Sequence, residues 1–487
     1  MAPRLRWLAA IAGFALLGYL AIAAMQPFSV LRVTFVLLVP LVLVFVIPSS
    51  LRTLREGAVE LVASLRWYHW LWLIVLAGAL VFRVRDAQEA AAEPIDSAAL
   101  LRIGAEIVVG LILLERLFMR KTRWLPSLFR GLIGIMAAFA LVNLASTLWS
   151  VKPLWTLYKS LEYLLDLSLI AAVIVSVRGA EDIEKFADWT WALIGLLAAT
   201  AWVGAVFDPA DALYAGLTFG PLGVRLAGVV PNISSNGLGD FCAILAAVAL
   251  CRLLYDPDRK FNRAWYGSLF AAGIVTLIFA QSRSSMVGLL ISILLLLFLT
   301  RRVVLGAALA VGTAFAGIFA LAFTNFGVVL WAYLLRGEDV QMAEGLTGRV
   351  NWWQYAFQKF TERPLTGFGG FAGGKFVILP GLGQSNVPDL HSNFVESLVD
   401  TGIWGPILLV IALVAIWWIL FKAFRSRRLS PSEHRLVIEA AAVMAVLTVR
   451  STVTGNIIDH LAIAFLTVLA ITEFMRRRLK FGGNFAT

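Results

Sequence analysis

Apolar segments of about 20 residues recur along almost the whole chain, separated by short polar stretches. A helix of this length spans the roughly 30 Å hydrocarbon core of a bilayer. The pattern predicts an all-α, polytopic membrane protein that folds as a single integral membrane domain over residues 1–487. We predict about 14 transmembrane helices, near residues 7–25, 28–48, 67–82, 98–115, 131–149, 155–176, 187–207, 236–252, 265–281, 284–300, 303–324, 403–421, 436–454 and 460–475.

The composition supports a membrane protein and excludes a nucleic-acid partner. Apolar residues make up 60% of the 487 positions and charged residues only 15%, whereas soluble domains are about half apolar and a quarter charged. The formal net charge is +11, but the basic residues form short clusters between apolar runs rather than one continuous stripe. Cys242 and Cys251 fall on opposite faces of one predicted helix, about 13 Å apart along its axis, and cannot form a disulfide.

The basic residues fall in alternate loops when the N-terminus is placed in the cytoplasm. These inside residues are Arg52, Arg55, Arg66, Arg116, Arg120, Lys121, Arg123, Arg130, Arg252, Arg259, Lys260, Arg263, Arg301, Arg302, Lys422, Arg425, Arg427, Arg428, Arg435, Arg476, Arg477, Arg478 and Lys480. This positive-inside pattern predicts a bacterial inner-membrane protein with cytoplasmic N- and C-termini. Arg4 and Arg6 precede the first apolar run as in a signal peptide, but a second run follows almost at once, so we expect the first helix to be retained.

Two long segments lie outside the cytoplasm in this topology: a first periplasmic loop at 208–235 and a large periplasmic loop at 325–402. Ordered loops of such length are uncommon without a function. The second segment is rich in glycine and aromatic residues and has no low-complexity tract. We therefore expect it to form a folded cap of short helices that carries the functional site.

Three arginines on the predicted outer side could bind a phosphate group, namely Arg225, Arg283 and Arg349. A guanidinium binds phosphate oxygens in a bidentate manner and keeps its charge at any pH. It could neutralise a pyrophosphate leaving group without a metal, so we expect a site with no metal and no cofactor. Each arginine has a structural alternative: a headgroup anchor for Arg225, a buried ion pair for Arg283 and a cation–π contact for Arg349.

His391 lies in the large outer segment, just before a predicted helix. A neutral imidazole there could take the proton from an acceptor hydroxyl as a general base, with Asp389 or a carbonyl fixing its tautomer. The alternative is a purely structural histidine. If His391 is not the base, His460, beside Asp459 in the last outer loop, is the next candidate.

Three further basic residues lie near the outer ends of predicted spans: Lys152, Lys159 and Arg450. Each is a candidate phosphate ligand. The lysines could equally extend along apolar surface to reach the headgroup region.

These residues belong to a set of short motifs spanning residues 146–405. The motifs are Ser146-Thr-Leu-Trp-Ser150-Val-Lys-Pro153, Arg225 through Pro231-Asn232 to Asn236-Gly237, Gln281-Ser-Arg283-Ser-Ser285, Thr347-Gly-Arg349 with Trp352-Trp353, Pro364-Leu-Thr-Gly367-Phe-Gly369, and His391-Ser-Asn393 followed by Gly402. In this order they resemble the O-antigen ligase and O-antigen or exopolysaccharide polymerase superfamily.

The resemblance implies a membrane glycosyltransferase with a GT-C-like helical bundle. Its donor would be a glycan linked to undecaprenyl pyrophosphate, and its acceptor another glycan or a lipid A-core, used at the periplasmic face among membrane lipids. Arg225 and Arg349 would bind the donor pyrophosphate, with Arg283 a weaker match, and His391 would be the base. The sequence does not separate a polymerase from a ligase.

The alternative function is a transporter, such as a flippase for the same lipid-linked sugars. A transporter predicts ionisable residues near the middle of the membrane and repeats between its halves. The polar residues singled out here lie instead toward one predicted face, so we favour the enzyme.

Overall fold

The computed structural model describes residues 64–78, 80, 87–93, 95–215, 222–255, 260–335, 348–384, 387, 389–455, 457–458 and 462–481. The chain divides into two compact units. The first unit comprises residues 1–193, 351–440 and 451–487, and the second comprises 194–350 and 441–450. The unit boundaries fall within three helices, α10 (Ala180–Phe207), α18 (Arg349–Phe360) and α22 (Pro431–Ser451).

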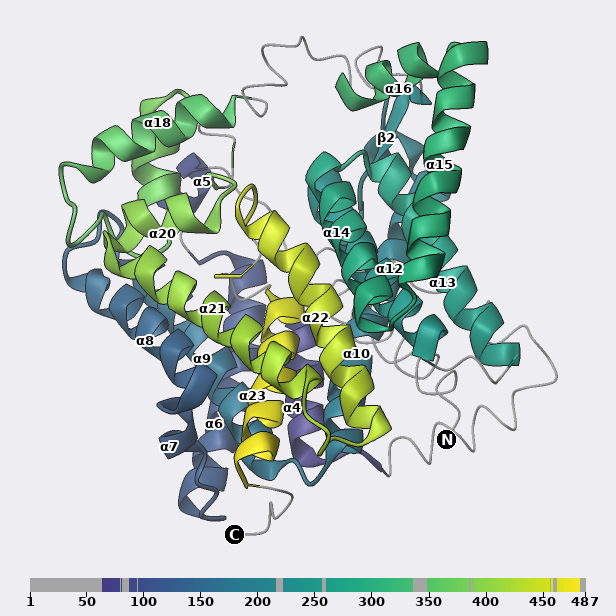
Figure 1. Cartoon of the computed structure of the whole chain (residues 1–487). Coiled ribbons are helices and arrows are strands. Elements are labelled where there is room, and N and C mark those ends of the chain that lie inside the picture. The colour runs from purple at the N-terminus through teal and green to yellow at the C-terminus, as the bar shows by residue number, and fades with distance from the viewer. Residues whose placement is uncertain are drawn as a thin grey trace. The chain divides into compact units, whose positions relative to one another are not determined.

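The first unit is a helical bundle with a cap of short elements. Its long helices are α6 (Ser97–Phe118), α8 (Gly131–Ala145), α9 (Pro153–Ser176), α21 (Trp404–Phe424) and α23 (Ile463–Phe481), with the shorter α4 (Trp67–Gly78), α5 (Ala87–Ala92) and α7 (Trp124–Leu128) beside them. Helix α8 packs against α9 and α21, and α23 contacts all three (Figure 1). Fully buried Phe139, Tyr163 and Phe465 belong to the interior of this bundle, which excludes water from its centre.

The second unit combines long helices with a small hairpin. The helices are α12 (Ser235–Tyr255), α13 (Lys260–Ala280), α14 (Arg283–Leu299), α15 (Val303–Phe323) and α16 (Phe326–Leu335), and α11 (Pro209–Ala212) leads into the hairpin. Strand β1 (Leu213–Ala215) pairs antiparallel with β2 (Val224–Leu226), placing Tyr214 opposite Arg225. Helix α12 packs against α13 and α14 (Figure 1).

Small residues allow this close helix packing. A Cβ added to Gly239 of α12 would lie 2.4 Å from the Cβ of Ser282, at the start of α14. A Cβ added to Gly273 of α13 would lie 3.0 Å from the carbonyl oxygen of Cys242. Cys242 and Cys251 are both buried in α12 and form no disulfide, as predicted.

The protein is an all-α membrane protein. Among the described residues, six helices are long and apolar enough to cross a membrane: Ser97–Phe118, Gly131–Leu148, Ala180–Phe207, Ser235–Tyr255, Arg263–Ala280 and Trp404–Phe424. The predicted spans at 7–25 and 28–48, and with them the fate of the first helix, lie outside the described residues. Each of the other predicted spans overlaps one described helix. The total number of spans stays a prediction.

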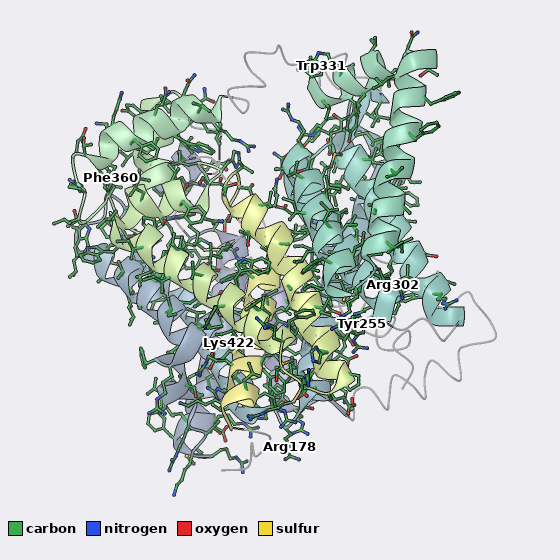
Figure 2. All side chains as sticks on the ribbon, viewed as in Figure 1. Arg178, Tyr255, Arg302, Trp331, Phe360 and Lys422 are labelled. Carbon is green, nitrogen blue, oxygen red and sulfur yellow. The ribbon has the colours of Figure 1, made fainter. Side chains whose placement is uncertain are left out.

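Six labelled side chains mark the two ends of each unit (Figure 2). In the first unit, Arg178 and Lys422 lie toward one end and Phe360 toward the other (Figure 2). In the second unit, Tyr255 and Arg302 lie toward one end and Trp331 at the other (Figure 2). The side of the membrane that each end faces stays a prediction.

The two long segments predicted outside the membrane contain short elements. Residues 208–235 hold α11, β1 and β2. The described part of 325–402 holds α16, α18, a π-helical turn (Gly374–Ile378), α19 (Leu379–Gly381) and α20 (Asn393–Thr401). The expected short helices are therefore present, while the periplasmic location and the single-domain organisation stay predictions.

Candidate functional site

His391 lies immediately before α20 and is paired with a carboxylate. Its Nδ1 is 2.8 Å from Oδ1 of Asp389, and its backbone N–H donates to the same oxygen at 2.6 Å. An Nδ1–H directed at a carboxylate leaves the lone pair on Nε2, the atom that a general base needs. The sequence predicted this pairing as one of two ways to fix the tautomer.

The backbone around His391 is held in an unusual conformation. His391 has φ of 54°, in the left-handed region that residues with a Cβ seldom occupy. Such strain persists only where neighbouring contacts fix it. Leu390 supplies two of these contacts: its N–H donates to Oε2 of Glu396 at 2.8 Å, and its carbonyl accepts from Nε1 of Trp353 at 2.9 Å. The ring of Trp352 lies 6.0 Å from the imidazole.

Helix α20 is in turn tied to a glycine turn, residues 364–374. Asp400 receives the backbone N–H of Phe371 on Oδ2 and that of Gly373 on Oδ1, both at 2.8 Å. The N–H of Gly369 donates to the Asp400 carbonyl at 2.9 Å. Asp400 therefore joins the helix that follows His391 to a loop that has little regular structure before the π-helical turn at Gly374.

The other side of the glycine turn packs on the junction of α8 and α9. The N–H of Gly370 donates to Ser146 Oγ at 2.7 Å, the Gly370 carbonyl accepts from Thr156 Oγ1 at 2.8 Å, and Trp149 Nε1 donates to the Thr366 carbonyl at 2.9 Å. The motifs 146–153 and 364–369 lie far apart in the sequence, but hydrogen bonds hold them together in the folded unit. Their role in the first unit is to place α20.

Two buried carboxyl groups on α20 have raised pKa values. Burial raises the pKa of Asp400 to about 7, although the N–H groups of Gly373 and Phe371 favour the charged form. Burial, followed by the charges of Asp400 and Asp389, raises the pKa of Glu396 well above its ordinary value. The folded protein therefore holds protons at pH values where the unfolded chain releases them.

This proton uptake predicts a pH-dependent stability. The free energy of unfolding contributed by Asp400 is greatest below its ordinary pKa of 3.8 and falls as the pH rises through about 7. We expect the melting temperature of purified protein to fall as the pH rises from 5 to 8. It should fall less in Glu396→Gln, because this variant has one titratable carboxyl group fewer in α20. Exposed Glu362 offers a matched control, since Glu362→Gln should keep the wild-type dependence. An unchanged dependence in Glu396→Gln would contradict the assignment.

Arg225 lies in β2 of the second unit, beside the start of α12. Its Nε donates to the Ala280 carbonyl at 3.3 Å and its Nη2 donates to Oδ1 of Asn236 at 3.1 Å. Gln281 Nε2 donates to the carbonyl of neighbouring Val224 at 3.1 Å. The hairpin thus presents a half-buried guanidinium whose orientation is set by its neighbours.

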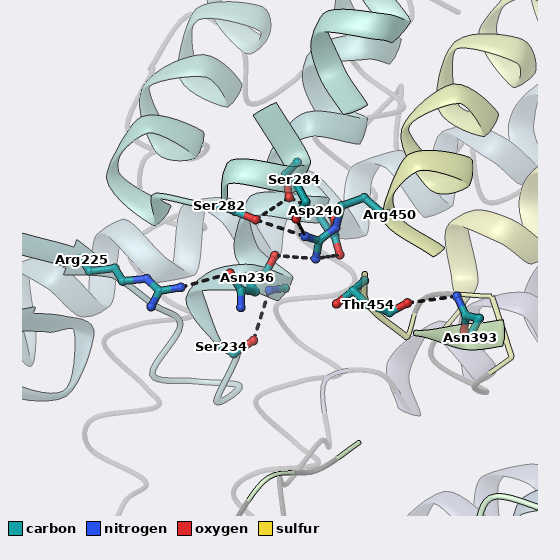
Figure 3. A network of polar contacts seen from close by, with 11 residues as sticks. Arg225, Ser234, Asn236, Asp240, Ser282, Ser284, Asn393, Arg450 and Thr454 are labelled. Carbon is teal, nitrogen blue, oxygen red and sulfur yellow. Dashed lines mark hydrogen bonds and ion pairs between the residues drawn. The ribbon is translucent and has the colours of Figure 1, made fainter. Parts of the chain in front are cut away.

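Arg450 is 1% exposed and pairs with Asp240 of α12. Its Nη2 donates to Asp240 Oδ2 at 2.6 Å, and Nε forms an ion pair with Asp240 Oδ1. Its Nη1 donates to the hydroxyls of Ser282, at 3.3 Å, and Ser284. Figure 3 shows this network beside Arg225 and Asn236. Arg450, which the sequence predicts as a phosphate ligand, thus forms an ion pair and hydrogen bonds with protein groups.

The remaining candidates have separate surroundings. Arg283 begins α14 and donates to the Leu334 carbonyl at 3.0 Å. Arg349 begins α18 and is half-buried. In the first unit, Lys152 Nζ lies 5.8 Å from the ring of Phe376, and Lys159 Nζ is 2.8 Å from Oε2 of Glu162. The four arginines belong to the second unit and His391, Lys152 and Lys159 to the first, while His460 lies outside the described residues.

The sequence reasoning missed Asp240, Glu396 and Asp400. Asp240 interrupts an apolar run, and a carboxylate at such a position usually has a partner. Glu396 and Asp400 are four residues apart, so they face the same side of a helix. Within the parts of the chain that the structure describes, no group of three or more His, Cys, Asp or Glu side chains is arranged to hold a metal ion.

Comparison with known proteins gives one finding. Residues 268–410 match the family described as O-antigen ligase. This segment contains Arg283, Arg349 and His391, together with the glycine turn. No curated protein sequence matches the chain.

Proposed function

We propose that the chain is a member of the O-antigen ligase and polymerase superfamily, which the match over residues 268–410 supports. In this proposal it transfers an undecaprenyl-pyrophosphate-linked glycan to an acceptor hydroxyl at the periplasmic face. The family supports a glycan-transfer role in the assembly of O-antigen or another polysaccharide. The acceptor is a second lipid-linked glycan in a polymerase and a lipid A-core in a ligase.

The observation that carries the proposal is the pairing of His391 with Asp389. In the reaction, Nε2 of His391 takes the proton from the acceptor hydroxyl as the oxygen attacks the anomeric carbon. The bond between that carbon and the pyrophosphate oxygen breaks, and its electron pair leaves with undecaprenyl pyrophosphate. Asp389 stabilises the imidazolium that forms.

The leaving group carries negative charge that must be neutralised. We assign this role to Arg225 and Arg349, because a guanidinium offers two parallel N–H donors to phosphate oxygens. The contacts of Arg225 with Ala280 and Asn236 orient its side chain before the donor binds. Such preorganisation lowers the cost of stabilising charge in the transition state.

The direct test uses purified full-length protein and a synthetic lipid-linked donor in detergent. Glycan transfer with release of undecaprenyl pyrophosphate would support the proposal, whereas a flippase releases none. Supplying a lipid-linked glycan or a lipid A-core as the acceptor, in separate reactions, distinguishes a polymerase from a ligase.

Replacing a proposed donor-binding arginine by lysine should impair transfer although the charge is kept. We expect Arg225→Lys and Arg349→Lys each to lower the transfer rate about tenfold or more, since a charge-assisted hydrogen bond is lost. Arg302→Lys, at an exposed arginine in the same unit, should leave the rate unchanged. Wild-type rates in both test variants would mean that these residues provide only general positive charge.

A further inference from the structure

The guanidinium of Arg450 makes four hydrogen bonds within the protein through Nη1 and Nη2. Its Nε makes none but forms an ion pair with Asp240. An arginine side chain has five N–H donors. Those of Arg450 face both carboxylate oxygens of Asp240, the hydroxyls of Ser282 and Ser284, and the backbone carbonyl of Asn236, at 3.4 Å. The side chain is also 1% exposed, so it presents no donor to a phosphate. The ion pair with Asp240 also cancels the charge of Arg450, so the residue is poorly suited to bind an anion.

The same contacts lead to Arg225 through one shared residue. The backbone carbonyl of Asn236 accepts from Arg450, while its side-chain Oδ1 accepts from Arg225 at 3.1 Å. Arg450 therefore holds the residue that orients the Arg225 guanidinium. Figure 3 shows Asn236 between the two arginines.

A second connection runs through the start of α14. Ser282 and Ser284 accept from Arg450, and the preceding Gln281 donates to the carbonyl of Val224, next to Arg225. Ser285 donates to Asp240 Oδ1 at 3.1 Å. The ion pair thus secures both segments that contact β2, the start of α12 and residues 280–285.

We infer that Asp240 and Arg450 form a positioning pair, which sets the orientation of Arg225 toward an anionic pyrophosphate group and does not itself touch the donor. This inference rests on the proposed function and adds to it the residues that preorganise the phosphate contact. The close approach of Gly239 to Ser282 brings the carboxylate and the serines within reach of one guanidinium. Removing the pair should weaken donor binding only through Arg225.

The test is a double-mutant cycle on binding of undecaprenyl pyrophosphate to the purified full-length protein in nanodiscs. We expect Asp240→Asn and Asn236→Ala each to weaken binding about tenfold, the usual worth of an oriented charge-assisted hydrogen bond. In an Arg225→Ala background neither substitution should weaken binding further, because residues that act through one group are not additive. Asp211→Asn, at an exposed carboxylate of the same unit, should bind as the wild type does.

Two results would overturn the inference. One is that Arg450→Ala and Arg225→Ala weaken binding by factors that multiply in the double variant, as two direct ligands would. The other is wild-type binding in Asn236→Ala. This variant leaves the Asp240–Arg450 ion pair intact and so decides the question even if Asp240→Asn does not fold. Failure of the wild-type protein both to bind the lipid and to transfer glycan would instead contradict the proposed function.

Discussion

His391→Ala is expected to lower glycan transfer per folded molecule by about 10² to 10⁴, the usual contribution of a general base. The amount of protein in the membrane and its affinity for the lipid-linked donor should stay close to wild type. The reason is that the imidazole is 21% exposed and pairs with Asp389 at its side-chain Nδ1, while the Glu396 and Trp353 contacts that hold the loop use the neighbouring Leu390. Removing the ring therefore removes the base and leaves those contacts in place.

His434→Ala provides the matched control for this experiment. His434 is also partly buried, and its Nε2 lies 2.9 Å from the carbonyl of Ser426, in a segment predicted to face the cytoplasm. Its loss should not change transfer. If transfer by His391→Ala stays within about tenfold of wild type, below the usual share of a general base, His391 is not the base and His460 becomes the residue to test.

Gly369→Ala is expected to prevent the first unit from folding correctly and to remove most of the protein from the membrane. Gly369 has φ of 113°, and an added Cβ would lie 2.4 Å from the Cβ and 2.7 Å from the Cα of Ser150. The strained backbone costs about 1–3 kcal/mol, and overpacking against another backbone adds about 1–3 kcal/mol. Together these cost about 2–6 kcal/mol, which is comparable with the total stability of a domain at the low end of the usual range of about 5–15 kcal/mol.

Two other glycines of the same unit separate strain from steric conflict. A Cβ added to Gly104, in helix α6, would meet no atom within 4 Å. The same is true of a Cβ added to Gly383, where φ is 70°. Gly104→Ala should leave the melting temperature unchanged or raise it, because alanine favours helix by about 1 kcal/mol. Gly383→Ala should lower it slightly through backbone strain alone. A Gly369→Ala protein as abundant and stable as Gly383→Ala would show that the glycine turn adapts to the added methyl group.

Much of the helical fold could be predicted from the spacing of apolar residues, because helices that cross a bilayer need long uninterrupted runs. The side-chain contacts between different helices could not be predicted in this way. Arg450 looked like a phosphate ligand because it lies near the outer end of a predicted span, and its ion pair depends on Asp240, more than 200 positions away. No local pattern links two such residues. The burial of Asp240 in a helix contact becomes visible only once α12 and α14 are packed.

The sequence predicts the kinds of residue in the site, but of their contacts it predicts only those between residues that are close in the sequence. His391 and Asp389 lie two positions apart, so a contact between them could be anticipated from sequence alone. Asp400 has no such sequence signal, because its partners are the backbone N–H groups of Phe371 and Gly373. Gly367 and Gly369 belong to a motif that the sequence shows, whereas Gly370, Gly373 and Gly374 lie beyond it. Their reason, close contact with residues 143–156 and 396–401, needed the structure.

The double attachment of the glycine turn has a consequence for local unfolding. A loop that is bonded to Asp400 on one side and to Ser146 and Thr156 on the other cannot open without releasing α20. The glycine turn and α20 should then form one cooperative opening unit, although only α20 is a regular helix. Each opening would withdraw the backbone support of His391. The fraction of time that this unit stays closed therefore sets an upper limit on the fraction of molecules with a correctly held base.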